Sequence, residues 1–275
     1  MASTKILNIG YLNIRGQTGL TVAKQLQIEA FMKFNHCDIL HLQEANIEDD
    51  SFTSCDFIKS SYNLLQNNST NKYGTASLIK TDFQYNNIQM DSEGRTIFFD
   101  IGDLTLGNIY LPSGTDGASR AGRERYCCEV LPRLLINSKE TGCIGGDFNC
   151  IVDKRDATHY PESKSSRGLQ RLIKLKDWQD SYRTLFPNTL TFSRYYENAR
   201  AEGATRIDRN YHFGNITVKE VKYIPIAFSD HLGLIVRVCL PESFSRILGP
   251  KSRASFGLKP EVIMDNIFKE RLAEA

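Results

Sequence analysis

Short runs of alternating apolar and polar residues dominate the chain and predict β-strands. Residues 5–14 (KILNIGYLNI) and 37–44 (CDILHLQE) follow this pattern, and similar runs recur as far as residue 240. Between the first two runs, residues 21–34 carry apolar positions at helical spacing, and Thr21 is suited to cap that helix. About ten to twelve strands result, which is too many for one ordinary sheet. The pattern therefore predicts two stacked sheets with helices outside them.

The remaining elements are further strands, two helices and a hairpin. Helices are expected over residues 119–135, where Pro132 should break or kink the end, and over the amphipathic residues 167–178. A hairpin is expected from residues 190–196 and 205–213, which flank the polar segment ENARAEGA. The other expected strands are residues 75–80, 95–102, 104–113, 142–151, 216–226 and the second half of 228–240.

The composition changes after residue 240. Residues 241–260 are rich in Ser, Gly, Pro and basic residues, and residues 261–275 have the pattern of a short amphipathic helix. We therefore expect residues 1–240 to form one domain. Residues 241–275 are expected to be a linker with a short helix that leads towards a further region.

The net charge of +2 is unevenly distributed along the chain. Residues 1–110 hold 8 Lys/Arg and 12 Asp/Glu, whereas residues 111–240 hold 20 and 15. A basic excess suits a polyanion, although an ordinary solvated face has the same composition. No apolar run approaches the length of a membrane span, and no signal-peptide layout is found, so neither membrane insertion nor secretion is expected. Seven scattered cysteines without a CxxC pair predict reduced thiols in an intracellular protein.

Polar residues stand beside apolar runs at seven predicted strand ends. Taken singly, each is explained as a turn residue, a solvated charge or an ordinary histidine. Taken together, they predict one shared edge of the two sheets, where loops on a rigid scaffold carry function. These residues are Asn13, Glu44, Tyr110, Asp147 with Asn149, Thr191, Asp208, and Ser229 with Asp230 and His231.

These residue types suit metal-dependent hydrolysis of a phosphodiester. Mg²⁺ takes few carboxylates together with waters and phosphate oxygens, so Glu44 is expected as the main ligand, with Asn13 or Asp230 beside it. Asp147 is suited to orient an attacking water as a base. The sequence has no Cys/His cluster with zinc spacing and no Walker A loop, which argues against a zinc enzyme and a P-loop NTPase.

The other polar residues are suited to bind the phosphate. His231 can donate to a phosphate oxygen and stabilise developing charge, and Asp208 can fix its tautomer or its positive charge. The amide of Asn149 can hold a phosphate oxygen, and Tyr110 offers a phenol. The two glycines before Asp147 are expected to let the backbone come close to a phosphate.

The same ordered residues resemble the endonuclease/exonuclease/phosphatase superfamily over roughly residues 5–240. The resemblance implies an α/β fold, a four-layer sandwich of two mainly antiparallel sheets flanked by helices. It also implies cleavage of phosphoesters with Mg²⁺, or Mn²⁺ in its place. Glu44 would be the metal ligand, and the catalytic roles would fall to Asp147, Asn149, Asp208, Tyr110, Asp230 and His231.

Within that superfamily the chain is most similar to the apurinic-like endonuclease domain of LINE-type non-LTR retrotransposons. The segments GDFNCIVDKRDA, LKDWQDSYRTLFPNTLTFSR and RIDRNYHF carry this likeness. It implies a nuclear enzyme that nicks double-stranded DNA for target-primed reverse transcription. A reverse transcriptase would then follow in the same full-length polypeptide.

The likeness also predicts which residues contact DNA. Thr191 would lie near the scissile phosphate and Arg155 in the loop after the catalytic strand. The hairpin that follows Thr191 is basic and aromatic, which suits phosphate contact and insertion into a minor groove. The expected DNA-contacting residues are Thr191, Arg155, Arg194, Tyr195, Tyr196, Arg200, Arg206 and Ser229.

Three alternatives stay open. A stand-alone apurinic/apyrimidinic repair endonuclease would use the same catalytic residues and would prefer abasic DNA to intact duplex. A phosphoesterase acting on inositol phosphates or sphingomyelin would show a different segment around its aspartate and arginine, and a membrane-facing loop. A binding module with a decayed site would lack part of the residue set, which is complete in this sequence.

Overall fold

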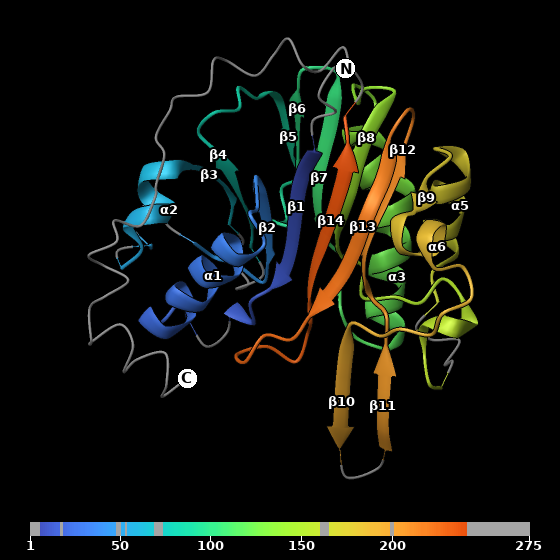
Figure 1. Cartoon of the computed structure of the whole chain (residues 1–275). Coiled ribbons are helices and arrows are strands. Elements are labelled where there is room, and N and C mark those ends of the chain that lie inside the picture. Colours follow the sequence, from blue (N-terminus) through green and yellow to red (C-terminus); the bar gives the residue numbers. More distant parts are fainter. Residues whose placement is uncertain are drawn as a thin grey trace.

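Two six-stranded sheets stack face to face in the computed structural model (Figure 1). The structure describes residues 6–16, 19–47, 51–52, 54–68, 74–159, 165–198 and 201–240; Arg200 and the expected linker 241–275 lie outside these ranges. In spatial order, the first sheet consists of β13 (Thr217–Ile224), β14 (Gly233–Cys239), β1 (Ile6–Asn13), β2 (Ile39–Gln43), β4 (Thr75–Lys80) and β3 (Tyr62–Asn67). The second consists of β5 (Asn86–Met90), β6 (Thr96–Ile101), β7 (Leu104–Tyr110), β8 (Thr141–Asp147), β12 (Asp208–Phe213) and β9 (Gln179–Asp180).

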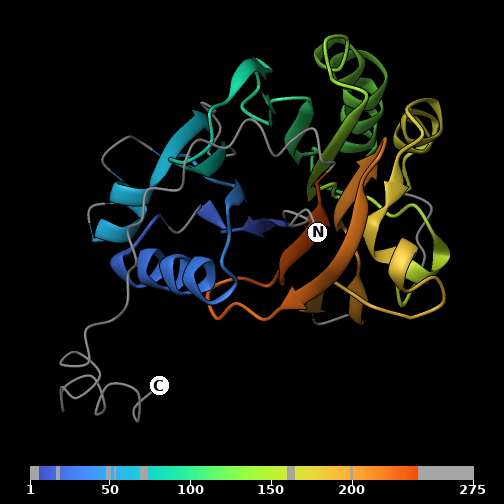
Figure 2. The same cartoon turned by 45° about the horizontal axis from the view of Figure 1, so that its top comes forward.

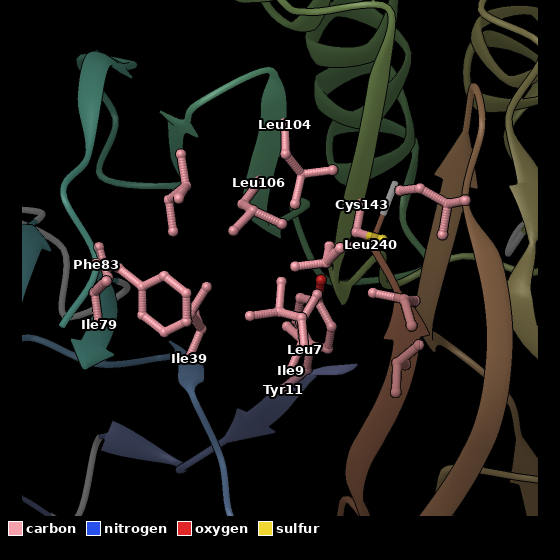
Figure 3. Packing of buried hydrophobic residues seen from close by; sticks show 14 of the residues in the cluster. Leu7, Ile9, Tyr11, Ile39, Ile79, Phe83, Leu104, Leu106, Cys143 and Leu240 are labelled. Carbon is pink, nitrogen blue, oxygen red and sulfur yellow. The ribbon is translucent and has the colours of Figure 1, made fainter. Parts of the chain in front are cut away.

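The main hydrophobic core lies between the two sheets (Figure 3). Leu7 and Ile9 of β1 meet Leu104 and Leu106 of β7 there, and all four side chains are fully or almost fully buried. The strands that contribute to this layer bury alternate residues on it, as the period of two in the sequence predicts. Close packing of this layer sets the distance between the sheets, and therefore the distance between the site residues at their shared edge.

Helices cover the outer face of each sheet, which completes the predicted four layers (Figures 1 and 2). Two further clusters of buried residues lie beneath these helices, one on each outer face. On the first sheet the helices are α1 (Val22–Phe34) and α2 (Asp56–Ser61). On the second they are α3 (Gly117–Arg125), η2 (Tyr126–Val130), α4 (Leu131–Leu134) and α5 (Arg167–Leu175), while α6 (Ser181–Leu185) contacts β12 and β13. The α/β sandwich expected from the sequence is confirmed.

Local sequence signals account for the helix boundaries. The hydroxyl of Thr21 accepts the N–H of Lys24 at 3.3 Å, so Thr21 caps α1 as predicted. Pro132 does not break the helical segment 117–134. The N–H of Leu131 instead bonds back to the carbonyl of Tyr126, five residues earlier, and this π-turn accommodates the proline ring and its missing donor.

The predicted hairpin pairs differently from the sequence-based expectation. Strand β10 (Arg194–Asn198) pairs with β11 (Ala201–Thr205) in a separate two-stranded ribbon. The chain then enters β12 at Asp208, and β12 pairs with β8 in the second sheet. The second strand of the hairpin is therefore 201–205, and only Thr205 of the predicted run 205–213 belongs to it. The residues from Asp208 onward form β12 and bury their side chains in the sandwich.

A buried amide ties the two sheets together close to the shared edge. Nδ2 of Asn108 in β7 donates to the carbonyls of Leu42 and Ala76, both at 2.9 Å, across the sandwich. Its Oδ1 accepts Nε2 of Gln43 at 2.7 Å. Because buried polar groups are costly unless they are bonded, this network favours one register between the sheets.

All seven cysteines are free. Six of them are buried, and Cys128 is exposed. Among the residues that the structure describes, no helix has the length and apolar composition of a membrane span.

Candidate active site

Strand register brings the predicted polar residues to one edge. Parallel β7 and β8 place Tyr110 beside Asp147, and antiparallel β12 places Asp208 on the other side of Asp147. In the other sheet β1 ends at Asn13, whose Nδ2 donates to Oδ2 of Asp147 at 3.0 Å. The carbonyl of Asn13 accepts Oγ of Ser229 at 2.8 Å, which brings the loop before β14 to the same edge. The predicted shared edge is confirmed.

A buried histidine–aspartate pair lies at the centre of this edge. Nδ1 of His231 is 2.9 and 3.0 Å from the two carboxylate oxygens of Asp208, and its Nε2 is 4.0 Å from Oδ2 of Asp147. Burial lowers the pKa of His231, but Asp208 and Asp147 outweigh it and raise that pKa to about 9. His231 is therefore a cation at neutral pH.

Ser193 is a site residue that the sequence analysis missed. Its Oγ donates to Oδ2 of Asp208 at 2.6 Å and accepts the N–H groups of Ile207 and Asp208, each at 3.0 Å. The predicted residue, Thr191, lies two positions earlier in the same segment and forms no hydrogen bond with the residues that the structure describes. The available signal was a second hydroxyl residue immediately before the ribbon.

Asp147 is a buried carboxylate with three amide donors. It accepts the backbone N–H of Asn149 at 2.9 Å, Nδ2 of Asn149 at 3.2 Å and Nδ2 of Asn13 at 3.0 Å. Burial, and after it the carboxylate of Asp208, raises the pKa of Asp147 to about 7 against the opposing effect of His231. Asp147 is consequently a stronger proton acceptor than an ordinary aspartate. The amide of Asn149 also donates to the carbonyl of Leu111 and is fixed in place.

Glu44 is the carboxylate on the more exposed side of the site. Its Oε1 accepts Nδ2 of Asn13 at 3.1 Å and the hydroxyl of Tyr110 at 3.2 Å, and no hydrogen bond to its Oε2 is found among the described residues. Oδ1 of Asn13 accepts the backbone N–H of Arg15. The amide of Asn13 thus turns its nitrogen towards both Glu44 and Asp147. It orients two carboxylates and offers them no oxygen for a shared cation.

The possible metal ligands are arranged differently from the predicted set. Ligand atoms of Asp147, Asp208 and His231 lie within 4.8 Å of one another, and Glu44 and Asp230 are outside this group. His231 carries a proton and both oxygens of Asp208 face it, so these two are poor ligands. Asp230 is engaged by two arginines. Glu44 alone suits Mg²⁺, which needs only one or two protein carboxylates.

Three residues at this edge have a left-handed backbone conformation. Arg15, Glu44 and Asn149 have φ angles of 48°, 52° and 47°, in the left-handed region that residues other than glycine seldom adopt. All three lie within two residues of the ends of β1, β2 and β8. At Gly16 a Cβ atom would lie 1.8 Å from the carbonyl oxygen of Glu44, so only glycine fits where the two strand ends cross. Such strain is typical of functional sites.

The two glycines at the end of β8 serve strand packing. A Cβ atom at Gly145 would lie 2.6 Å from the ring of Tyr11 and 2.7 Å from the carbonyl oxygen of Arg209. A Cβ atom at Gly146 would lie 2.1 Å from the carbonyl oxygen of Ile109. The expectation that these glycines admit a phosphate is therefore wrong, because neighbouring strands occupy the space above them.

The ribbon β10–β11 begins at the site and projects away from the sandwich (Figure 1). Arg194 forms a β-bridge with His231, and its Nε donates to Oδ2 of Asp230 at 2.8 Å. Tyr195 is 55 % exposed, so its ring is available to a partner. An open pocket of about 720 Å³ lies beside the ribbon, lined by Thr158, His159, Phe192, Tyr195, Tyr196, Gly203 and Ala204.

Arg206, a predicted DNA contact, is inside the protein. Its side chain is 1 % exposed and pairs with Asp156 at 2.9 Å and Asp180 at 2.6 Å. The prediction that Arg206 contacts DNA is therefore wrong, since its guanidinium forms part of an internal ion cluster. Arg155 is exposed, and its guanidinium pairs with Asp153 at 2.6 Å.

Arg206→Ala is expected to lower the free energy of unfolding by about 3–5 kcal/mol, because it leaves the fully buried Asp156 with less compensation. Urea denaturation followed by circular dichroism measures this change. Arg155→Ala removes an exposed arginine–aspartate pair and is the control, expected to leave stability nearly unchanged. Equal stability of the two variants would contradict the structural role of Arg206.

Activity is predicted to have a bell-shaped pH dependence, because Asp147 must be deprotonated and His231 must be protonated. As pH falls through about 7, Asp147 gains a proton and can no longer accept one from water. As pH rises through about 9, His231 loses the proton that makes it a cation. Activity on a phosphodiester substrate should thus be highest between these values, as measured by kcat/KM against pH. A profile that stays flat from pH 5 to pH 10 would contradict both assignments.

Several solved structures share the fold of this chain. An AP endonuclease from Archaeoglobus fulgidus matches with a TM-score of 0.66 and 19% identity, covering 84% of this chain and 98% of that chain. A 3' phosphatase, NExo from Neisseria bound to product DNA hairpin, gives 0.65 and 18%, covering 84% and 98%. Truncated Caenorhabditis elegans TDP2 gives 0.59 and 18%, covering 86% and 98%. No family model matches the sequence.

Proposed function

We propose that this protein is a metal-dependent endonuclease that cuts a phosphodiester bond in double-stranded DNA. The observation that carries the proposal is the continuous run of contacts from Glu44 through Asn13, Asp147 and His231 to Asp208. It joins an accessible carboxylate, a base with a near-neutral pKa and an imidazolium at one edge. Hydrolysis of a phosphodiester needs these three kinds of group.

Each residue has a defined task in this reaction. Asp147 accepts a proton from the water whose oxygen forms the new bond to phosphorus, while the bond to the leaving oxygen breaks. His231, kept cationic by Asp208, donates from Nε2 to a phosphate oxygen and stabilises the charge that develops there. Burial and the neighbouring Glu44 raise the pKa of the Tyr110 phenol, so Tyr110 stays protonated and acts as a donor.

Glu44 would hold the divalent cation, Mg²⁺ or Mn²⁺. When bound, the cation supplies positive charge to the phosphate oxygens during cleavage. Asn13 and Tyr110 both donate to Oε1 of Glu44 and thereby fix the orientation of the carboxylate. The other oxygen, Oε2, would then bind the cation. The amide of Asn13 also keeps Glu44 and Asp147 at a constant separation.

DNA is supported as the substrate by the surroundings of the site. The ribbon carries the exposed Tyr195 directly beside the reacting groups, where an aromatic ring can contact a groove or a base. The matched structures include an AP endonuclease and a phosphatase bound to a product DNA hairpin. A DNA duplex lying across the edge would meet the ribbon and the site together.

Within this class we favour a nicking enzyme of a LINE-type retrotransposon that acts in the nucleus and is followed by a reverse transcriptase in the same polypeptide. The support is the sequence likeness in residues 146–157, 175–194 and 206–213. The second candidate is an apurinic/apyrimidinic repair endonuclease. The name of one matched structure, the AP endonuclease from Archaeoglobus fulgidus, favours it.

Cleavage of supercoiled plasmid with Mg²⁺ tests the proposed function. We expect conversion to the nicked circle, with little linear product, and loss of activity in EDTA. A parallel comparison of intact and abasic duplex oligonucleotides separates the two candidates: comparable rates support the nicking enzyme, and a large preference for the abasic duplex supports the repair enzyme. No cleavage of either substrate would refute the proposed function.

A further inference from the structure

Asp230, next to the catalytic His231, lies between two arginines from different parts of the chain. Its Oδ2 accepts Nε of Arg194 at 2.8 Å, and its Oδ1 lies 3.4 Å from Nε of Arg15. The three side chains are 27 % (Asp230), 35 % (Arg194) and 53 % (Arg15) exposed, so this group stands at the surface of the site.

The fold fixes both arginines beside the catalytic residues. Arg194 opens the ribbon and bridges to His231, and the N–H of Tyr195 bonds to the carbonyl of Asp230. Arg15 stands at the end of β1 in a left-handed conformation. The buried ammonium group of Lys24 donates to its carbonyl at 3.0 Å and holds that conformation. Neither arginine is carried by a free loop end.

The charges of the site explain why cations are needed here. Glu44, Asp147 and Asp208 place three carboxylates at one edge, against the single imidazolium of His231. Like charges repel more strongly near a protein surface than in bulk water, so an approaching phosphodiester would be repelled. Arg15 and Arg194 together with Asp230 add a net positive charge at the surface of the site, and this charge offsets the repulsion.

Asp230 is suited to hold the two guanidinium groups in place. Burial raises its pKa, but Arg194, His231 and Arg15 outweigh that effect and lower it, so Asp230 remains ionised. A carboxylate fixed between two guanidiniums would keep their remaining faces turned in a constant direction. A planar guanidinium fork binds phosphate oxygens in pairs, which makes arginine better suited than lysine to this task.

We propose that Arg15 and Arg194, held together by Asp230, form a clamp that binds a phosphodiester of the DNA strand beside the bond being cut. In this assignment Asp230 is a positioning residue for the clamp and takes no part in binding the metal. The inference rests on the proposed function, because it takes DNA as the ligand. Its test uses DNA binding without a divalent cation, so that it stands apart from cleavage.

Arg15→Gln and Arg194→Gln are each expected to raise the Kd for a duplex oligonucleotide about 10- to 100-fold, measured by fluorescence anisotropy in EDTA. The slope of log Kd against log salt should fall by about 0.9 for each arginine removed. Arg237→Gln is the matched control. Arg237 also pairs with a carboxylate, Glu220 at 2.8 Å, is 34 % exposed, and lies in β14 opposite Asn8, away from the site edge. It should leave Kd unchanged.

Lysine variants separate the effect of the positive charge from the effect of the guanidinium geometry. Arg15→Lys and Arg194→Lys keep the positive charge, so the salt slope should be retained while the affinity still falls. Thermal unfolding of every variant checks the fold. Unchanged Kd in both glutamine variants would overturn the clamp, whether or not the wild-type protein cuts DNA. A wild-type protein that binds duplex through these arginines but cuts nothing would refute the proposed function and leave the clamp standing.

Asp230→Asn tests the second half of the inference. If Asp230 only positions the arginines, the Mg²⁺ concentration for half-maximal nicking should stay within about 2-fold of the wild-type value, and KM for DNA should change. A tenfold or greater rise in the Mg²⁺ requirement with an unchanged KM would make Asp230 a metal ligand and overturn this assignment.

Discussion

Asp147→Asn is expected to reduce DNA nicking by about 10²- to 10⁴-fold, the usual contribution of a positioned base. The substitution preserves shape and keeps one oxygen, which can still accept the side-chain amides of Asn13 and Asn149 that both bond to Oδ2. It removes the ability to accept a proton from water. The measurement is kcat on supercoiled plasmid in saturating Mg²⁺, with DNA affinity measured separately, and the affinity should remain close to that of the wild type.

Asp100→Asn is the matched control for this experiment. Asp100 is also a buried aspartate of the second sheet, 1 % exposed, and it lies in β6 outside the site. It accepts the hydroxyl of Thr105, and an asparagine can still accept that bond. Its activity should match the wild type. Wild-type nicking by Asp147→Asn, or an equal loss in both variants, would remove Asp147 from the role of base.

His231→Gln is expected to lower kcat by about 10²- to 10³-fold, the usual cost of losing one donor that stabilises developing charge. Glutamine keeps hydrogen-bonding capacity but carries no positive charge at any pH. The alkaline limb of the pH profile near 9, which belongs to His231, should therefore disappear in this variant. Residual activity that still falls above pH 9 would show that another group causes that limb.

Two further variants test whether the effect of His231→Gln is specific to the charge of His231. His212→Gln is the control, because His212 is a buried histidine of β12 that bonds to Ser181 and lies outside the catalytic contacts. Asp208→Asn should leave a protonatable imidazole but move the alkaline limb below pH 9, because Asp208 is the main group that raises the pKa of His231. A purely structural role for Asp208 would lower activity without moving that limb.

The sequence was sufficient to predict the two-sheet sandwich and the shared edge. Strand periodicity is a local property, and the polar residues at the strand ends are adjacent in sequence to the runs that position them. Asp147 is the last residue of the apolar strand β8, and Asp208 is the first residue of β12, so each could be recognised by position alone. Strands in which apolar and polar residues alternate only weakly were not predicted. Examples are β3 and β5, where most side chains are only partly buried or exposed.

The burial of individual arginine side chains in and after the ribbon could not be predicted from residue type. Arg194 and Arg206 both belong to a basic stretch and look equivalent in the sequence. Arg194 reaches the site surface, whereas Arg206 enters the interior because Asp156 and Asp180, from two other elements, compensate its charge. Ser193 could not be predicted for the same reason. It matters because it contacts Asp208, and no local sequence pattern indicates that contact.

The fold class, the edge at which the site lies and the kinds of chemical group at that edge follow from the order of residues alone. The pairing of the charged groups with one another follows only from the packing of the two sheets. Asn13 and Asp147 are 134 positions apart, yet their side chains are hydrogen-bonded, and the pKa values of Asp147 and His231 depend on such contacts. The physical reason is that periodicity acts between neighbours along the chain, whereas desolvation and Coulomb interaction depend on distances that exist only after the sheets have packed.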